Sequence, residues 1–153
     1  MARSLSPLTR SEEDRRELIL WAVACAERVL PVFERERPED GRPRAALETA
    51  LQFARGEIRV GVARKAAVAA HAAAREASSP GATAAARACG EAVSVAHMAA
   101  HARGAAWYAL KIVALAHPDD PDDVASAVGR QDAWHRRHLP PRFLDFVYPP
   151  PGT

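Results

Sequence analysis

The sequence has few aromatic residues, two cysteines and no excess of charge of either sign. Aromatic side chains make up 6% of the 153 residues, whereas alanine is abundant. A core filled by alanine requires backbones that approach closely, and alanine is also the best helix former, so the composition favours packed helices. The net charge is only +2, with basic and acidic residues interspersed. Without a long basic run, the chain lacks the electrostatic footprint of a nucleic-acid-binding protein.

Targeting and membrane signals are also missing. The opening "MARSLSPLTRSEEDRR" has no apolar segment of the kind found in signal peptides. No uninterrupted apolar run reaches the length of about 18 residues that a membrane-spanning helix needs. Cys25 and Cys89 lie in Ala-rich surroundings that suit small buried thiols in a reducing compartment. We therefore expect a cytoplasmic protein with no membrane partner.

Common enzyme signatures and strand patterns are absent as well. The chain has no glycine-rich phosphate loop, no G-x-S-x-G elbow and no C-x-x-C pair. No alternation of apolar and polar residues runs longer than about four positions, as a strand would require. The length is that of one ordinary domain. The sequence thus predicts an all-α single domain, a bundle or short array of helices.

Apolar spacing and turn residues predict about five helices. Thr9 and Glu12 have the spacing of a capping box, which would start the first helix near residue 10. The clearest turn is "SSPGAT" at 78–83, and Asp120 is placed to cap a helix that starts at Pro121. The predicted helices cover about 10–35, 43–55, 57–77, 82–116 and 121–137, with a short helical turn at about 141–147. Residues 1–8 are expected to form a flexible N-terminus, 9–147 the helical domain and 148–153 a Pro-rich tail.

His97 and His101 are four residues apart inside the Ala-rich predicted helix. Within one continuous helix both imidazoles project from the same face, as two ligands of one metal ion would. Zinc needs a third or fourth ligand, for which His71 is the candidate. Across the turn at 78–83, however, His71 and His97 would differ in height by about 10 Å. Glu91 is expected to point elsewhere, so no carboxylate accompanies the histidines as in an H-E-x-x-H helix.

Three interpretations of the histidines therefore stay open. We favour side chains hydrogen-bonded within or at the edge of a helical core. The others are a site for a small molecule or partner, and a divalent-metal site of His71, His97 and His101. Under the favoured interpretation the protein has no cofactor.

Other side chains could contact a partner. Arg103, Trp107 and Lys111 form a stripe on the longest predicted helix, where Gly104 would allow a close approach to the backbone. Arg64 and Arg75 share a side of the 57–77 helix with His71 and could bind an anion, an acidic partner or the acidic residues of the first helix. The candidate ligand- or partner-binding residues are His97, His101, Trp107, Tyr108, Trp134, His138, Arg64 and Arg75.

Four ordered stretches resemble a bacterial family of immunity proteins. They lie between about residues 8 and 147: "LTRSEEDRRELILWAVACAERVLPVFERERPEDGRPRAALETA", "ARGEIRVGVARKAAVAAHAAARE", "AARACGEAVSVAHMAAHARGAAWYALKIV" and "DAWHRRHLPPRF". The family pattern A-H-x-x-x-H-A corresponds to Ala96, His97, His101 and Ala102, and its W-x-x-x-H-L-P pattern to Trp134, His138, Leu139 and Pro140. Many members resemble one another in a polar residue before the second histidine, where this chain has Ala100. The resemblance implies an all-helical, cytosolic protein that neutralises a toxin.

Two functions follow as hypotheses. The leading one is a non-enzymatic binding protein of immunity type that neutralises or sequesters a protein toxin or a small molecule. Its recognition face would combine the 82–116 helix with the C-terminal tail, using Trp107, Tyr108 and Trp134 as anchors. The alternative is a metal-dependent helical-bundle enzyme built on the three histidines. A shared Ala-rich face would also suit a homodimer.

Overall fold

The computed structural model describes residues 4–116 and 119–153, and these contain helices and turns but no strand. The helices are α1 (Glu12–Glu27), α2 (Leu30–Glu36), α3 (Arg42–Ala54), α4 (Val60–Glu76), α5 (Pro80–Ser94), α6 (His101–Leu115), α7 (Pro121–His138), the 3₁₀ turn η1 (Pro141–Phe143) and α8 (Leu144–Val147). The predicted all-α class is confirmed. The prediction of about five helices was too low, because two predicted helices are each divided and the C-terminal turn has two parts. Residues 1–3 of the predicted flexible N-terminus lie outside the described residues.

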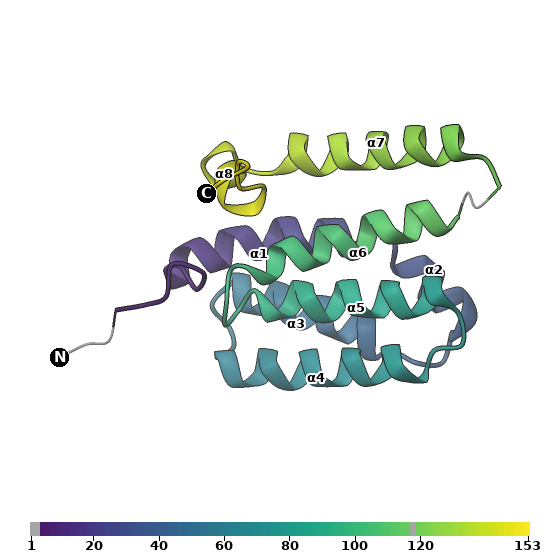
Figure 1. Ribbon diagram of the computed structural model, residues 1–153. Coiled ribbons are helices and arrows are strands. Elements are labelled where there is room, and N and C mark those ends of the chain that lie inside the picture. Colours follow the sequence, from purple (N-terminus) through teal and green to yellow (C-terminus); the bar gives the residue numbers. More distant parts are fainter. Residues whose placement is uncertain (1–3, 117–118) are drawn as a thin grey trace.

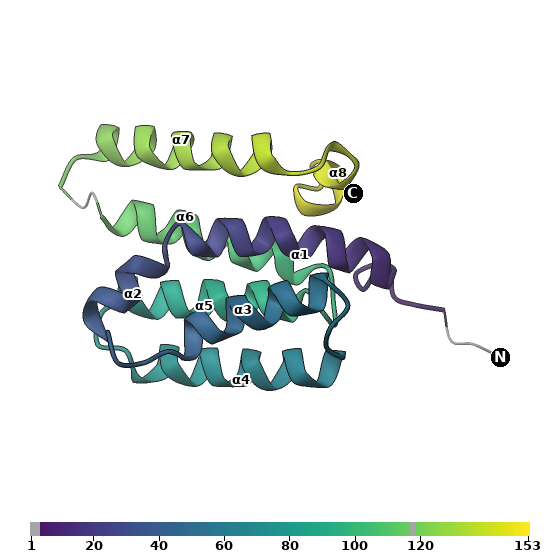
Figure 2. The same ribbon diagram turned by 180° about the vertical axis from the view of Figure 1, so that it is seen from behind.

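The helices α4, α5 and α6 lie side by side in one layer, with neighbours antiparallel (Figure 1). On the other side of this layer lie α1, α2 and α3, as the view from behind shows (Figure 2). The helix α7 lies along α6, at the edge of the layer away from α4. No described helix has both the length and the apolar character needed to cross a membrane.

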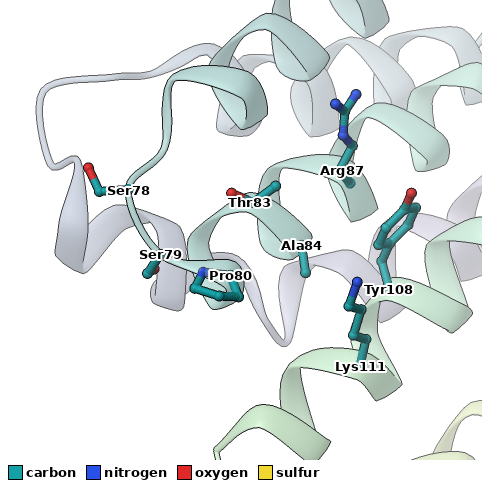
Figure 3. A pocket seen from close by; sticks show the side chains of 8 residues that line it. All are labelled: Ser78, Ser79, Pro80, Thr83, Ala84, Arg87, Tyr108 and Lys111. Carbon is teal, nitrogen blue, oxygen red and sulfur yellow. The ribbon is translucent and has the colours of Figure 1, made fainter.

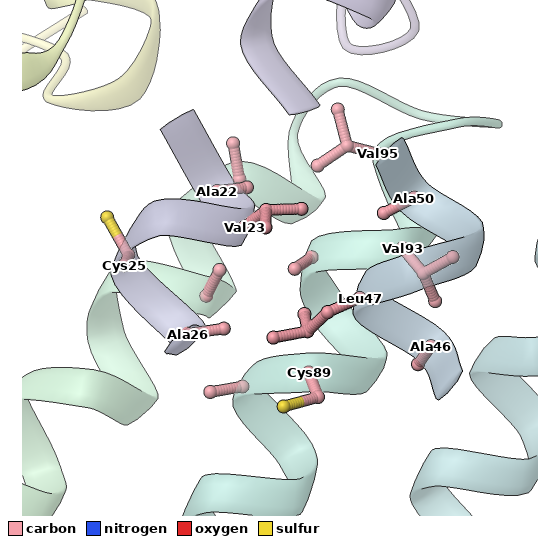
Figure 4. Packing of buried hydrophobic residues seen from close by; sticks show 14 of the residues in the cluster. Ala22, Val23, Cys25, Ala26, Ala46, Leu47, Ala50, Cys89, Val93 and Val95 are labelled. Carbon is pink, nitrogen blue, oxygen red and sulfur yellow. The ribbon is translucent and has the colours of Figure 1, made fainter. Parts of the chain in front are cut away.

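The core is assembled mainly from small side chains around α5. This helix contacts α1, α2, α3, α4 and α6, which is possible because most of its buried residues are alanine. Cys25 of α1 and Cys89 of α5 are free, buried thiols, as the sequence indicated. Figure 4 shows Cys89 and Val93 of α5 among alanines of α1 and α3, with Leu47 between them. Close backbone packing thus replaces the large side chains that the sequence lacks.

The predicted 82–116 helix is divided at residues 95–100, so that α5 and α6 fold back against each other. One straight helix of that length would extend about 52 Å and leave much of its apolar surface in water. The connecting backbone is held by the N-terminal segment, since the amides of Ala99 and Ala100 donate to the carbonyls of Thr9 and Leu8 at 3.2 and 3.0 Å. Buried Arg15 donates to the Ala96 carbonyl at 2.9 Å. Tertiary hydrogen bonds therefore replace helical ones at the break.

Two other predicted boundaries need correction. The first helix begins at Glu12 with Ser11, not Thr9, as its N-cap, because the Ser11 side chain accepts from the amide of Asp14. It then divides before Pro31, which lies in the first turn of α2 where no amide donor is required. Asp120 caps α7 as predicted, accepting from the amides of the first turn. The Pro-rich tail is not free at its start, because the Tyr148 ring packs edge-on against Trp21 at 6.4 Å between centroids.

Candidate functional site: the exposed strip of α5

The helix α5 reaches the surface along one strip between α4 and α6. From Ala82 to Ser94 every residue is buried except Thr83, Arg87 and Glu91. These three residues are four apart, so they lie one above another on the same helix face. The strip forms the floor of the α4–α5–α6 face, and the side chains of α4 and α6 stand on either side of it. Polar groups here are confined to a narrow line within an otherwise buried helix.

Glu91 connects this strip to α6. Its Oε2 atom lies 2.7 Å from Nδ1 of His101, and its Oε1 atom lies 3.9 Å from Nε2 of His71. The carboxylate rests on Gly104, where an added Cβ would be 2.7 Å from Oε2. Gly104 therefore does allow a close approach, and the group that approaches is a side chain of α5. The expectation that Glu91 points away from the histidines was wrong, because it assumed that α5 and α6 were one continuous helix.

His71 connects the same strip to α4. Its Nδ1 atom accepts a hydrogen bond from Nη1 of Arg87 at 2.9 Å, since a guanidinium group can only donate. In the neutral ring the proton is then on Nε2, which faces Glu91. Burial, and next the neighbouring Arg87 cation, lower the pKa of His71, so the ring is neutral near pH 7. The ring lies against Gly90, where a Cβ would be 2.6 Å from Nε2.

His97 lies in the segment between α5 and α6 and not on a helix face shared with His101, as the sequence had predicted. The two rings are nevertheless neighbours, with centroids 5.0 Å apart and planes at 60°. Burial is the main cause that lowers the pKa of His97, followed by His101. The Nδ1 atom of His97 is buried without a hydrogen-bond partner among the described residues. His97 and His71 both line the same hollow.

Two of the three proposed metal ligands are engaged in other contacts. His71 uses Nδ1 to accept from Arg87, and His101 uses Nδ1 to contact Glu91. A guanidinium cation beside His71 would repel a metal ion. Within residues 4–116 and 119–153, no group of three or more His, Cys, Asp or Glu side chains has the geometry to hold a metal ion. The structure thus gives the metal-dependent alternative no geometric support.

The face contains two hollows, one on each side of the His71–Arg87 contact. The first, here called the α4 hollow, has a volume of about 490 Å³ and is lined by Arg64, Ala67, Val68, His71, Arg75 and His97. The second, here called the α6 hollow, has a volume of about 410 Å³ and is lined by Ser78, Ser79, Pro80, Thr83, Ala84, Arg87, Tyr108 and Lys111. Figure 3 shows Arg87 of α5 and the Tyr108 and Lys111 side chains of α6 among the residues that line this second hollow. Neither lining includes a carboxylate.

The predicted stripe on α6 is divided between two surroundings. Trp107 is 57% exposed, with its ring edge-on to Tyr108 at 4.9 Å and Nζ of Lys111 at 5.3 Å from its centroid. Arg103 instead donates from Nε to the Phe146 carbonyl at 2.9 Å. Tyr108 and Lys111 thus line the α6 hollow and Trp107 is exposed beside them, whereas Arg103 fixes the C-terminal segment.

Trp134 and His138 are not brought to this face. Both are in α7, where the rings stack with centroids 4.1 Å apart. The guanidinium of Arg28, the residue that follows α1, lies 4.1 Å from the Trp134 centroid. Nδ1 of His138 donates to the Trp134 carbonyl at 2.8 Å. The candidate residues therefore form two groups. Trp134 and His138 of α7 are one group, and the other contains His97, His101, Arg64, Arg75, Trp107 and Tyr108.

The sequence-based reasoning missed Thr83 and Arg87, and it considered Glu91 but expected that side chain to point elsewhere. Their signal was the spacing of three polar residues at four-residue intervals in an otherwise apolar helix. That spacing was obscured because the whole 82–116 stretch was interpreted as one helix with its functional face around His97 and His101.

Comparison with known proteins gives one family and no individual relative. A family described as Imm-5 like putative immunity protein matches residues 8–142, which is most of the chain. Neither curated proteins nor solved structures give a significant match. The extent of the family match confirms the resemblance found in the four sequence stretches. The chain belongs to the Imm-5 like immunity protein family.

Proposed function

We propose that this protein neutralises a protein toxin by binding it, without catalysis, through the α4–α5–α6 face. The observation that carries the proposal is the composition of that face in a member of an immunity protein family. An exposed tryptophan, Trp107, lies beside Tyr108 and the Lys111 cation. Tryptophan, tyrosine and arginine are the residues that most often dominate the energetics of protein–protein interfaces.

The aromatic part of this face is ordered before any partner arrives. The Trp107 ring is held by its edge-on contact with Tyr108 and by the Lys111 cation. All three residues belong to α6, a helix of 15 residues packed on α5. Side chains that are already fixed lose little conformational entropy on binding, so more of their contact energy contributes to affinity. A helix surface of this kind suits a protein partner.

The shape of the hollows also favours a protein partner over a small molecule. Sites for small molecules usually enclose most of the ligand surface. The α4 and α6 hollows are open on the solvent side and lie next to exposed Val68 and Trp107. Both cysteines are fully buried, and burial raises the pKa of each thiol, so neither provides an activated nucleophile. The face is therefore better suited to contact than to catalysis.

The test is protection of a bacterial host against the toxic product of a gene adjacent to the one that encodes this protein. Co-expression of the wild-type chain should restore growth, and Trp107→Ala should abolish both protection and co-purification of the two proteins. Helicity measured by circular dichroism should stay unchanged, because Trp107 is exposed. The matched control is Leu20→Ala on α1, whose side chain is 50% exposed and which should protect fully. Full protection by Trp107→Ala would rule out this face as the binding surface.

A further inference from the structure

The cations around the two hollows have no carboxylate partner, whereas eight arginines elsewhere in the described residues do. Elsewhere in the described parts of the chain, ion pairs with carboxylates involve Arg10, Arg16, Arg37, Arg42, Arg44, Arg55, Arg136 and Arg142. Within the same described residues, no carboxylate lies within 4.0 Å of the cationic groups of Arg64, Arg75, Arg87 or Lys111. Arg64, Arg75, Arg87 and Lys111 thus place positive charge without a carboxylate partner around the two hollows.

These four cations, here called the cationic strip, lie along the α4–α5–α6 face. Arg64 and Arg75 are exposed on α4 at the α4 hollow, and Arg87 and Lys111 line the α6 hollow. The hydrogen bond from Arg87 to His71 joins the two hollows, because one residue lines each of them. Glu91 is the carboxylate nearest to this junction. It is directed toward His101 and Gly104 and is absent from both linings.

From this strip, which rests on the function proposed above, we infer that the partner is recognised through an acidic segment. Carboxylates of the partner would bind Arg64 and Arg75 at the α4 hollow, and Arg87 and Lys111 at the α6 hollow. A guanidinium group binds a carboxylate through two parallel N–H···O bonds, which gives direction as well as strength. Val68, 68% exposed beside Arg64 and Arg75, would contact an apolar side chain between the acidic ones.

The His71–Arg87 contact would fix the geometry of recognition. One nitrogen of the Arg87 guanidinium is held by His71, so the side chain, which lines the α6 hollow, is oriented before binding. Thr83 and Tyr108 add hydroxyl groups to the same hollow. An ordered cation beside neutral donors binds a carboxylate with a smaller entropic cost than a mobile surface lysine.

The test uses the ¹⁵N-labelled full chain and the capped hexapeptide Glu-Leu-Glu-Glu-Leu-Glu, with Gln-Leu-Gln-Gln-Leu-Gln as the uncharged probe. Amide shifts should change along α4, α5 and α6 with the acidic peptide alone, and the affinity should fall as salt increases. Arg64→Gln/Arg75→Gln should weaken binding about tenfold. The control Arg130→Gln/Arg137→Gln removes the same charge from exposed positions of α7 and should change the affinity less than about twofold.

Several results would overturn the inference. They are the absence of shifts on this face, equal binding of the Gln peptide, and an equal loss of affinity in the α7 control. A second copy of the chain could also supply acidic residues from Asp119, Asp120, Asp122 and Asp123. If sedimentation detects a dimer that Arg64→Gln/Arg75→Gln abolishes, the partner that binds this face is a second copy of the chain and not the toxin.

The inference and the proposed function can fail separately. If Arg64→Gln/Arg75→Gln still protects cells as well as the wild type, neutralisation stands and acidic recognition is wrong. If the acidic peptide binds this face and the wild-type chain gives no protection, the strip is confirmed as an acidic-segment site and neutralisation is wrong.

Discussion

His101 contacts Glu91 through Nδ1 and Oε2 at 2.7 Å, and this single contact links α6 to the exposed strip of α5. An ionised carboxylate can only accept, so Nδ1 of His101 is the donor. Through the other oxygen Glu91 lies 3.9 Å from His71, which in turn accepts from Arg87. The Glu91 carboxylate thus connects His71 of α4 and His101 of α6 on the α4–α5–α6 face.

Replacing Glu91 with alanine should destabilise the fold by about 1–2 kcal/mol, because a half-buried histidine loses a charge-assisted hydrogen bond. Urea denaturation would measure the change in the free energy of unfolding. Glu57→Ala is the matched control, since Glu57 pairs with Arg55 at 2.7 Å on the exposed surface, where solvent screens the pair, and its loss should be clearly smaller. Equal losses in the two variants would show that Glu91 has no organising role.

Two glycines in helices should respond differently to alanine. At Gly129 in α7 an added Cβ meets nothing within 4 Å, so Gly129→Ala should stabilise the protein by up to about 1 kcal/mol through helix propensity. At Gly104 the Cβ would lie 2.7 Å from Oε2 of Glu91. Gly104→Ala should therefore displace the carboxylate and lose most of that gain.

Thermal unfolding of the two glycine variants would give the comparison, and the ring resonances of His101 would report the displaced contact. An identical rise in stability, with the His101 resonances unchanged, would mean that Glu91 does not rest on Gly104 in solution.

Acid should weaken the contact between α7 and the rest of the protein. His135 is fully buried, and burial lowers its pKa from 6.5 to about 4. Between these values the unfolded chain binds a proton that the folded chain does not, so the free energy of unfolding falls as the pH decreases. Below about pH 6.5 the loss should grow to about 3 kcal/mol at pH 4, and above pH 6.5 it should vanish.

The measurement is urea denaturation at several pH values with the wild type and His135→Leu. The variant lacks the titrating ring, so its stability should depend less on pH in this range. Carboxylates titrate in both proteins and cancel in the difference. The same slope in both would exclude His135 as the cause.

Some helix boundaries could be predicted from the sequence and others could not. The start of α7 followed from local rules, because Asp120 caps the helix and Pro121 occupies its first turn. The break at 95–100 could not be predicted in this way, because no proline or glycine marks it. It depends on Arg15 and on the carbonyls of Leu8 and Thr9, which are about 80 or more residues away along the chain.

The candidate site shows the same division. His71, His97 and His101 were selected from the sequence because histidines are unusual in Ala-rich helices, and the structure does bring them together. Arg87 was missed and Glu91 was expected to point elsewhere, because the role of both depends on α5 and α6 folding back against each other, which changes the neighbours of the residues in both helices.

The sequence by itself determined that the chain is helical, that alanine allows close packing, and where proline and capping residues punctuate the helices. Each of these properties depends on interactions within a few residues. Only the tertiary structure decided that one helix becomes α5 and α6, that Glu91 lies between His71 and His101, and that four cations gather without carboxylate partners. The physical reason is that burial of apolar surface and pairing of charge depend on residues distant in sequence, which local patterns do not specify.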